Sequence, residues 1–340
     1  MKLHLPEFLR TAFMVIAVSS TALAANVIDK GTINQSEDYN GNYIYSPTSE
    51  TTLKYDSITS PNISIQGRTN TGSTVHLEIG AIDASEGRVN LHTYKGNIAV
   101  GDIQADYIQV ATNQGSITIS GTVVATGSEA STITTSGSEG KASGNIILAG
   151  ANITNVAFTN YIINESYSEM IPVGAVEIQG DTTLNNVYFS SDTVEVAAGA
   201  NLTLEDVAFT ARQESIDGVA SSTGLVLGDN VTLTLIGNEP VEVKSLTLGT
   251  GVDIVISLSE EDFAALDGKE FEIFSVTEGE VDLSNVNFTF TDGEEYKSGT
   301  ISATGGSISV TNSHAIPEPT TATLSLLALA ALAARRRRKA

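Results

Sequence analysis

The sequence predicts an all-β fold, specifically a right-handed parallel β-helix, or solenoid, with a cap at each end. Apolar and polar residues alternate in short bursts between Gly, Asn or Asp turn residues, as in strands with one buried face. Helical periodicity is nearly absent, and one six-residue motif recurs through the second half of the chain. The alternative is an antiparallel β-sandwich in which similar strands recur through composition alone.

The recurring motif has an aliphatic residue, a polar residue, Asn or Asp, Val, any residue and Phe. It occupies 153–158, 184–189, 204–209 and 283–288. The second and third copies start 20 positions apart. The gap between the first and second copies is longer, at 31 positions, and the gap between the third and fourth is 79 positions, close to four times 20. A repeat of about 20 residues is typical of a solenoid, in which each coil covers the apolar edge of the next. We therefore expect Val and Phe in the interior and the Asn or Asp side chains stacked as a hydrogen-bonded ladder at one corner. These corner residues are Asn155, Asn186, Asp206 and Asn285.

Five segments follow one another along the chain. They are a signal peptide (1–24), an N-terminal cap (25–70), the solenoid body (71–258), a C-terminal cap (259–312), and a linker with a sorting tail (313–340). In the C-terminal cap, Ser259 is expected to begin a short helix, because acidic residues fill the following turn and Gly268 comes after it. This arrangement resembles the β-helical passengers of autotransporter-type adhesins.

The N-terminus has the features of a secretory signal peptide. Lys2 and Arg10 form a weakly basic start, and residues 11–23 form a short apolar stretch. Ala22 and Ala24 supply the small residues that a signal peptidase needs at the −3 and −1 positions. The stretch is shorter than the roughly 20 residues of a permanent span. We expect a signal helix that is removed, with the mature chain beginning near Ala25.

The C-terminus combines three features in a fixed order. Pro317-Glu318-Pro319 is followed by an apolar stretch at 320–334, predicted to be a hydrophobic helix, and then by Arg335, Arg336, Arg337 and Arg338. At about 1.5 Å per residue this helix reaches about 22 Å, less than the ~30 Å hydrocarbon core. The basic cluster remains cytoplasmic by the positive-inside rule, so the body lies outside the inner membrane. Such a short span suits a temporary transmembrane anchor.

This order of features resembles the PEP-CTERM sorting signal. The resemblance covers the segment from Ile316 to the end of the chain. It implies recognition by an exosortase, a transpeptidase-like membrane enzyme of Gram-negative bacteria that make extracellular polysaccharide. It also implies delivery to the cell surface or the extracellular space. The expected partners are signal peptidase, the exosortase, the inner membrane during transit, and extracellular polysaccharide or host glycans.

The exported body is strongly acidic. Seven of the 17 Lys and Arg residues and two of the 40 Asp and Glu residues lie outside residues 25–316, which leaves ten basic and 38 acidic residues and a net charge of −28. Nucleic acid is excluded as a partner, because it is bound through clusters of Lys and Arg. The chain has no cysteine, which excludes disulfides and a thiol nucleophile.

Catalytic motifs are absent from the sequence. His76 and His92, with Glu78 nearby, are sixteen residues apart and would approach each other on successive coils, as a metal site needs. We favour the alternative, two exposed polar strand residues, and expect no enzyme activity, cofactor or metal. The expected function is a non-enzymatic structural or adhesive protein of the envelope or matrix. The alternative is a secreted carbohydrate-active enzyme, or a glycan-binding module, built on a β-helix.

Overall fold

The computed structural model describes residues 26–41, 48–68, 73–138, 143–163, 170–210, 223–265, 269–292, 296–304 and 307–312. These residues form β-strands and one short helix, which confirms the all-β prediction. The expected signal helix and the expected helix at 320–334 lie outside them. Within the described part of the chain, no helix is long and apolar enough to cross a membrane.

The strands follow one another with short connections. The first third contains β1 (Asn26–Asp29), β2 (Thr32–Asn34), β3 (Tyr39–Asn40), β4 (Thr51–Thr59), β5 (Asn62–Gly67), β6 (Val75–Thr93), β7 (Ile98–Thr112), β8 (Ile117–Ile119) and β9 (Thr122–Ala125). The middle contains β10 (Ser131–Ser138), β11 (Ile146–Leu148), β12 (Asn152–Thr154), β13 (Val156–Ile163), β14 (Met170–Pro172), β15 (Ala175–Ile178), β16 (Thr182–Ser190), β17 (Thr193–Val196) and β18 (Asn201–Ala208). The last part contains β19 (Gly224–Leu227), β20 (Thr232–Ile236), β21 (Val241–Val243), β22 (Leu246–Leu248), β23 (Val252–Ser257), α1 (Glu260–Ala265), β24 (Glu270–Val276), β25 (Val286–Thr291), β26 (Tyr296–Thr304) and β27 (Ser307–Asn312).

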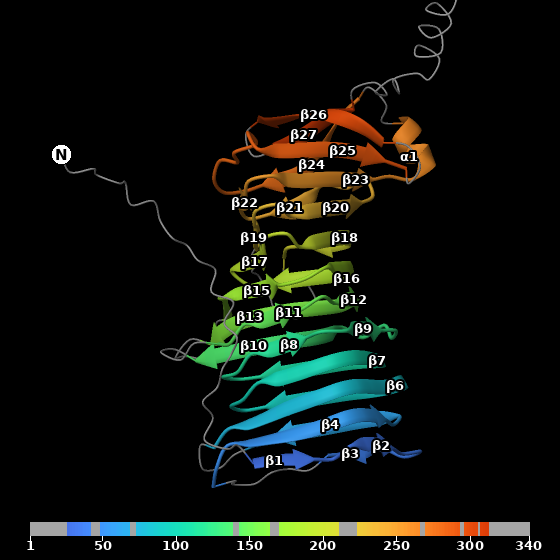
Figure 1. Ribbon diagram of the computed structural model, residues 1–340, viewed down its shortest axis with the longest axis vertical. Coiled ribbons are helices and arrows are strands. Elements are labelled where there is room, and N and C mark those ends of the chain that lie inside the picture. The colour runs from blue at the N-terminus through green and yellow to red at the C-terminus, as the bar shows by residue number, and fades with distance from the viewer. Residues whose placement is uncertain are drawn as a thin grey trace, which may run out of the picture.

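The strands of the body pair in parallel with strands one layer further along the chain. The step between paired residues is short from Ala175 to Thr193 and nearly twice as long from Val252 to Val286. Figure 1 shows the resulting layers stacked along the long axis, from β1 at one end to β26 at the other. Because the body pairs in parallel, the antiparallel β-sandwich is wrong.

Inward-facing side chains of successive layers fall into line because the register is kept from layer to layer. One aliphatic column contains Ile28, Leu53, Leu77, Ile98, Ile117, Ile146, Val176, Val194, Leu225 and Leu246. All of these except Ile28 are at most 5% exposed. Full burial of one such side chain contributes about 1.5–3 kcal/mol, so the columns are the main source of stability.

The recurring motif adds an aromatic stack to this core. Phe158, Phe189 and Phe209 are buried, and their ring centroids are 5.4 Å apart at both steps. Val156 and Val187 are also buried, whereas Val207 is partly buried. The interior position of Val and Phe is therefore confirmed for Val156, Val187 and the three Phe residues of the first three copies. Phe288 of the fourth copy is also buried, at 8% exposed.

The fourth copy, at 283–288, does not continue the column of the first residue of the motif. Leu204 is followed in register by Leu235, Ile256 and then Phe290, so Phe290 rather than Leu283 occupies the equivalent place. The prediction failed here because the steps from Leu204 to Leu235, Ile256 and Phe290 are 31, 21 and 34 residues long, and the last of them includes α1. A spacing near four periods was a coincidence of unequal layers.

Glycines permit close contact between layers at one corner. A Cβ atom on Gly115 would lie 2.0 Å from the carbonyl oxygen of Gly96, and a Cβ on Gly144 would lie 2.0 Å from that of Gly115. Backbone of one layer therefore rests directly on backbone of the next. Any larger residue there would force the layers apart.

The two ends of the stack differ. At the C-terminal end the parallel order stops, since β27 pairs antiparallel with both β24 and β26, and β26 pairs antiparallel with β25. Ser259 caps α1 as predicted, because the backbone N–H of Asp262 donates to its hydroxyl at 3.1 Å; Gly268 lies outside the described residues. At the N-terminal end, β1 to β5 already keep the parallel register of the body.

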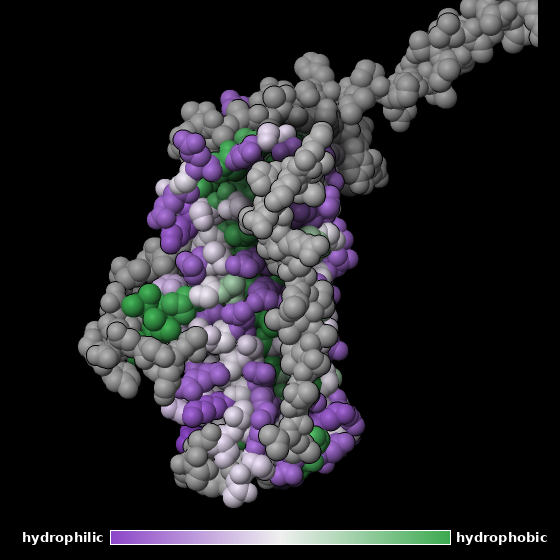
Figure 2. Space-filling view, turned by 60° about the vertical axis from the view of Figure 1, so that its left-hand side comes forward, coloured by the Kyte–Doolittle hydropathy of each residue, from purple (hydrophilic) through white to green (hydrophobic). Residues whose placement is uncertain are grey.

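At mid-height the end of β13 forms an antiparallel hairpin with β14, while β13 itself stays paired in parallel with β10 and β16. Its residues Ile162 and Ile163 are partly buried, and Ile171 is 40% exposed. Figure 2 shows a mainly hydrophilic surface with a hydrophobic patch at this height. Residues 164–169, between these two strands, lie outside the described part of the chain.

The aromatic stack generates a stability prediction. Phe189→Ala removes the central ring and leaves a cavity between Phe158 and Phe209, so we expect a loss of about 3–5 kcal/mol. Urea unfolding followed by circular dichroism measures it. The control is Thr183→Ala, an exposed site on the same strand, which should change stability by less than about 0.5 kcal/mol. Equal effects of the two variants would contradict the interior role of the stack.

Candidate functional site

The residues predicted to direct sorting lie outside the described part of the chain. This holds for Ala22 and Ala24 of the signal cleavage site and for the C-terminal set. That set comprises Pro317, Glu318, Pro319, Arg335, Arg336, Arg337 and Arg338. Their assignment therefore rests on sequence, and the structure addresses the exported body.

The structure does not bring the two histidines together. Both belong to β6, where His76 pairs with Thr52 and His92 with Gln66 and Ala111, so they lie in different columns. His76 is bonded to Glu50 (2.8 Å), and His92 to Asn113 (3.1 Å). The idea that their separation spans one coil is wrong, because β6 runs through both positions as one long strand. Among the described residues, no group of three or more His, Asp or Glu is placed to hold a metal ion.

The expected corner turn is present for three of its four residues, and the hydrogen-bonded ladder is present for two of them, Asn155 and Asn186. Asn155, Asn186 and Asp206 have left-handed backbones, with φ of 60°, 50° and 53°. The Asn186 amide donates to Asn155 Oδ1 at 2.8 Å, and the Asn155 amide donates to the Ala125 carbonyl at 2.7 Å. Asn and Asp tolerate this conformation better than other non-glycine residues. The ladder thus fixes a sharp turn in each layer.

Asn285 does not belong to this ladder. It has no left-handed backbone, and its amide donates to the neighbouring Ser284 hydroxyl. Asn230, outside the recurring motif, is a further left-handed residue that the motif did not predict, with φ of 57°. Gly199 and Gly251 occupy the equivalent turn position in other layers, with φ of 75° and 68°. The only feature of the sequence that indicates this turn is the Asp-Asn pair that precedes the strand.

A second corner contains buried polar side chains. Thr93, Thr112, Thr135 and Asn160 lie in register and are at most 1% exposed. The hydroxyls of Thr93 and Thr112 both donate to the Gly96 carbonyl, at 2.8 and 2.9 Å. The Asn160 amide donates to the Gly144 carbonyl at 3.1 Å, and the Thr135 hydroxyl has no partner among the described residues. Thr93, Thr112 and Asn160 thus satisfy carbonyls that the sheet leaves unpaired at the bend.

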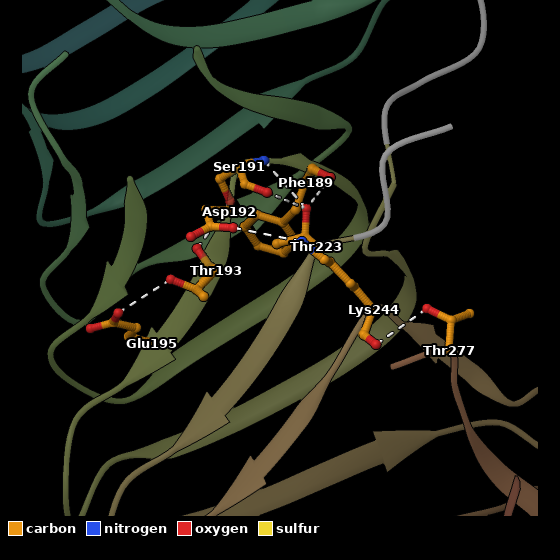
Figure 3. A network of polar contacts seen from close by, with 8 residues as sticks. All are labelled: Phe189, Ser191, Asp192, Thr193, Glu195, Thr223, Lys244 and Thr277. Atoms are coloured by element: carbon orange, nitrogen blue, oxygen red, sulfur yellow. Dashed lines mark hydrogen bonds and ion pairs between the residues drawn. The ribbon is translucent and has the colours of Figure 1, made fainter. Parts of the chain in front are cut away.

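Further along the chain, Thr223 plays the same part. Its hydroxyl lies 3.0 Å from the carbonyl oxygens of Phe189 and Ser191. Figure 3 shows it pointing toward these residues, with Lys244 beside it. Ser191 is 1% exposed and its hydroxyl donates to the Thr193 carbonyl, so it is not available as a nucleophile. The cluster holds backbone in place.

The charged groups around Thr223 are exposed. Lys244 Nζ lies 3.9 Å from Asp192 Oδ1, and the two side chains are 39% and 62% exposed. The Thr193 hydroxyl donates to Glu195 on the same strand at 3.2 Å. An exposed ion pair of this kind contributes about 0–1 kcal/mol. The arrangement therefore places exposed charge beside Thr223.

Outward polar side chains link each layer to the next. The backbone N–H of Asn97 donates to His76 Nδ1 at 3.0 Å, that of Ser116 to Asn97 Oδ1 at 3.0 Å, and that of Asn145 to Ser116 Oγ at 3.2 Å. Each side chain therefore accepts a hydrogen bond from the following layer. The role of His76 is to accept such a bond, which requires the neutral ring nitrogen.

Aspartates do the same at the other bends. Asp102, Asp181 and Asp229 accept the backbone N–H of Thr122 (2.7 Å), Asn201 (3.1 Å) and Thr250 (2.8 Å). The backbone N–H and then the hydroxyl of Thr250 lower the pKa of Asp229 below its ordinary value. These carboxylates act as acceptors for the next layer, and their chemistry is structural.

Comparison with known proteins identifies the tail. The family model of the PEP-CTERM protein-sorting motif matches residues 315–339. The chain therefore carries this motif, which marks an exported protein processed by an exosortase through a C-terminal, membrane-anchored sorting signal. No curated protein and no solved structure matches the chain.

The corner ladder generates a second prediction. Asn186→Gly loses the hydrogen bond to Asn155 but keeps the turn, because Gly adopts the left-handed conformation readily. Asn186→Ala loses the same hydrogen bond and also places Ala, which disfavours this conformation, in the left-handed region. We expect the Ala variant to lose about 1–3 kcal/mol and the Gly variant clearly less. The matched control is Asn285→Ala, outside the ladder, which should change stability by under about 0.5 kcal/mol. The midpoints of urea unfolding rank the stabilities of the three variants. An equal loss of stability in Asn186→Ala and Asn285→Ala would contradict the prediction.

Proposed function

We propose that the body is a non-enzymatic right-handed β-solenoid that exosortase delivers to the cell surface or matrix, where it serves as a rigid structural or adhesive element. The observation that carries this proposal is the unbroken register of the columns. A second column runs through eleven layers and is aliphatic in all but the last: Ile33, Ile58, Ile82, Ile103, Val123, Ile153, Leu184, Leu204, Leu235, Ile256 and Phe290. Such stacks resist bending because every layer is bonded to both neighbours.

The hand of the solenoid follows from a general rule. Parallel strands of one sheet are joined by right-handed connections in about 98% of cases, because of the twist of the strands. The paired strands here are joined through one turn of the chain, so the same rule applies to each layer.

The polar groups support a role without turnover. The hydroxyls of Thr93, Thr112 and Ser191 donate to backbone carbonyls, and Asp102, Asp181 and Asp229 accept backbone N–H groups. A general acid or base needs a carboxylate free to exchange protons with a substrate. These groups instead satisfy the bends of the stack.

One surface favours a second candidate, a glycan-binding module. An outward column beside the second column consists of Thr122, Asn152, Thr183, Thr203 and Thr234. Hydroxyl and amide groups at the regular strand spacing of about 4.8 Å offer repeated donors and acceptors to a polysaccharide chain. Binding along this face would make the adhesive role specific for glycans.

The sorting role is tested by replacing the Pro-Glu-Pro triplet. Changing Pro317, Glu318 and Pro319 to Ala should prevent exosortase processing, because the recognition element is lost while the apolar anchor remains. Fractionation and immunoblotting should then show a longer species retained in the membrane fraction. As a control, Pro172→Ala changes a proline of the body and should leave processing intact. Unchanged size and location of the triple variant would contradict the assignment.

The non-enzymatic role is tested with purified exported protein and a panel of polysaccharides. We expect no new reducing ends and no rise in unsaturated-uronate absorbance, since the groups that would act are bonded to backbone. Affinity electrophoresis in the same polysaccharides separates the two candidates. If a polysaccharide retards the exported protein, and the double variant Thr183→Val/Thr203→Val is not retarded, the result supports glycan binding. If no polysaccharide retards the protein, the result supports the structural role. Any depolymerisation would overturn the proposal.

A further inference from the structure

The N-terminal end of the stack exposes the edge of its first layer. Among the described strands, β1 and β2 pair only with β4, and β3 pairs only with β5. Val27 is 62% exposed and Ile28 is 39% exposed, although Ile28 begins a column whose other members are at most 5% exposed. A strand edge with apolar side chains is a template for pairing with another strand.

The backbone of β1 is set up for such pairing. Asn26 N donates to Glu50 O at 3.1 Å, and Lys30 N donates to Lys54 O at 2.8 Å. Backbone groups of alternate residues point to opposite sides of a strand. The N–H and C=O groups of Val27 and Asp29 are therefore directed away from β4, toward the open edge, where they need partners.

We propose that this edge pairs with the same edge of a second copy of the chain, giving a head-to-head dimer. A two-fold axis through Ile28 aligns β1 antiparallel with β1 of the second copy. Val27 of each copy then exchanges backbone hydrogen bonds with Asp29 of the other, and the two Ile28 side chains face each other as a non-hydrogen-bonded pair. The contact is isologous, so both copies use the same surface.

A second copy fits this edge better than other occupants for two reasons. Cleavage at the predicted site after Ala24 would leave a single residue, Ala25, before β1, so residues 1–24 would not cover the edge in the mature protein. The opposite end is closed by the antiparallel strands β24, β26 and β27, so pairing stops at two copies instead of continuing into a fibre. The dimer doubles the length of the rigid element, with both C-terminal ends outward.

Charge makes the association depend on salt. Each exported body has a net charge of −28 by sequence, and repulsion between two such bodies is screened over a Debye length of about 10 Å at 0.1 M salt. Light scattering of the exported protein should give twice the monomer mass, with a dimer fraction that rises as salt is added. A monomer mass at all salt concentrations would overturn the proposal.

Cysteine cross-linking of the exported protein tests the geometry of the dimer. The chain has no cysteine of its own, so any disulfide between two copies must form through the introduced cysteine. In a non-hydrogen-bonded antiparallel pair the Cα atoms are about 4.5 Å apart, within disulfide range. Ile28→Cys with an added thiol oxidant should give a dimer on a non-reducing gel. The matched control is Ile171→Cys, at a side chain that is 40% exposed on the β13–β14 hairpin, which should stay monomeric.

A second substitution tests the backbone pairing. Val27→Pro removes an N–H of the open edge and leaves the bonds to β4, so adding it to Ile28→Cys should abolish the cross-link. No dimer from Ile28→Cys, or equal dimer from Ile171→Cys, would overturn the proposal. So would a cross-link from Ile28→Cys to a different protein, which would show another occupant.

Discussion

Parallel register between layers is the constraint on which the rest of this structure depends. Each layer places an aliphatic side chain over the one before it, as Leu77 lies over Leu53 and Ile98 over Leu77. The columns bury apolar area without any need for disulfides, which a chain lacking cysteine cannot form. Every other feature serves to keep the register through the bends.

The bends use three devices with one purpose, which is to satisfy backbone groups where sheet pairing stops. Left-handed Asn or Asp residues such as Asn186 make the turn and stack on one another. Buried hydroxyls such as that of Thr112 reach interior carbonyls, and outward side chains such as Asn97 accept N–H groups of the next layer. Most polar groups described at the bends are used in this way, whereas Lys244 and Asp192 beside Thr223 lie exposed on the surface.

Much of the fold was predictable, since period-2 alternation and turn residues define strands with one buried face. The recurring motif located the aromatic stack and three corner residues, Asn155, Asn186 and Asp206. It failed at 283–288, because the layers differ nearly two-fold in length and sequence spacing alone cannot count layers of unequal length. The hypothesis that His76 and His92 approach each other on successive coils failed for the same reason. Only the structure shows that both residues belong to one long strand, β6.

The sequence by itself determined where the protein goes, because the sorting motif at 315–339 is read as a linear signal by a membrane enzyme. It also determined that the body is built of strands. The tertiary structure decided which strands pair, that they pair in parallel, and that the polar residues of the bends face backbone groups. It also showed that, among the described strands, the C-terminal end finishes in antiparallel pairs, whereas β1, β2 and β3 each pair on one side alone. Those properties depend on contacts between residues that are a full layer apart in the chain. The packing of whole layers sets the alignment of these residues, so the local sequence indicates little of it.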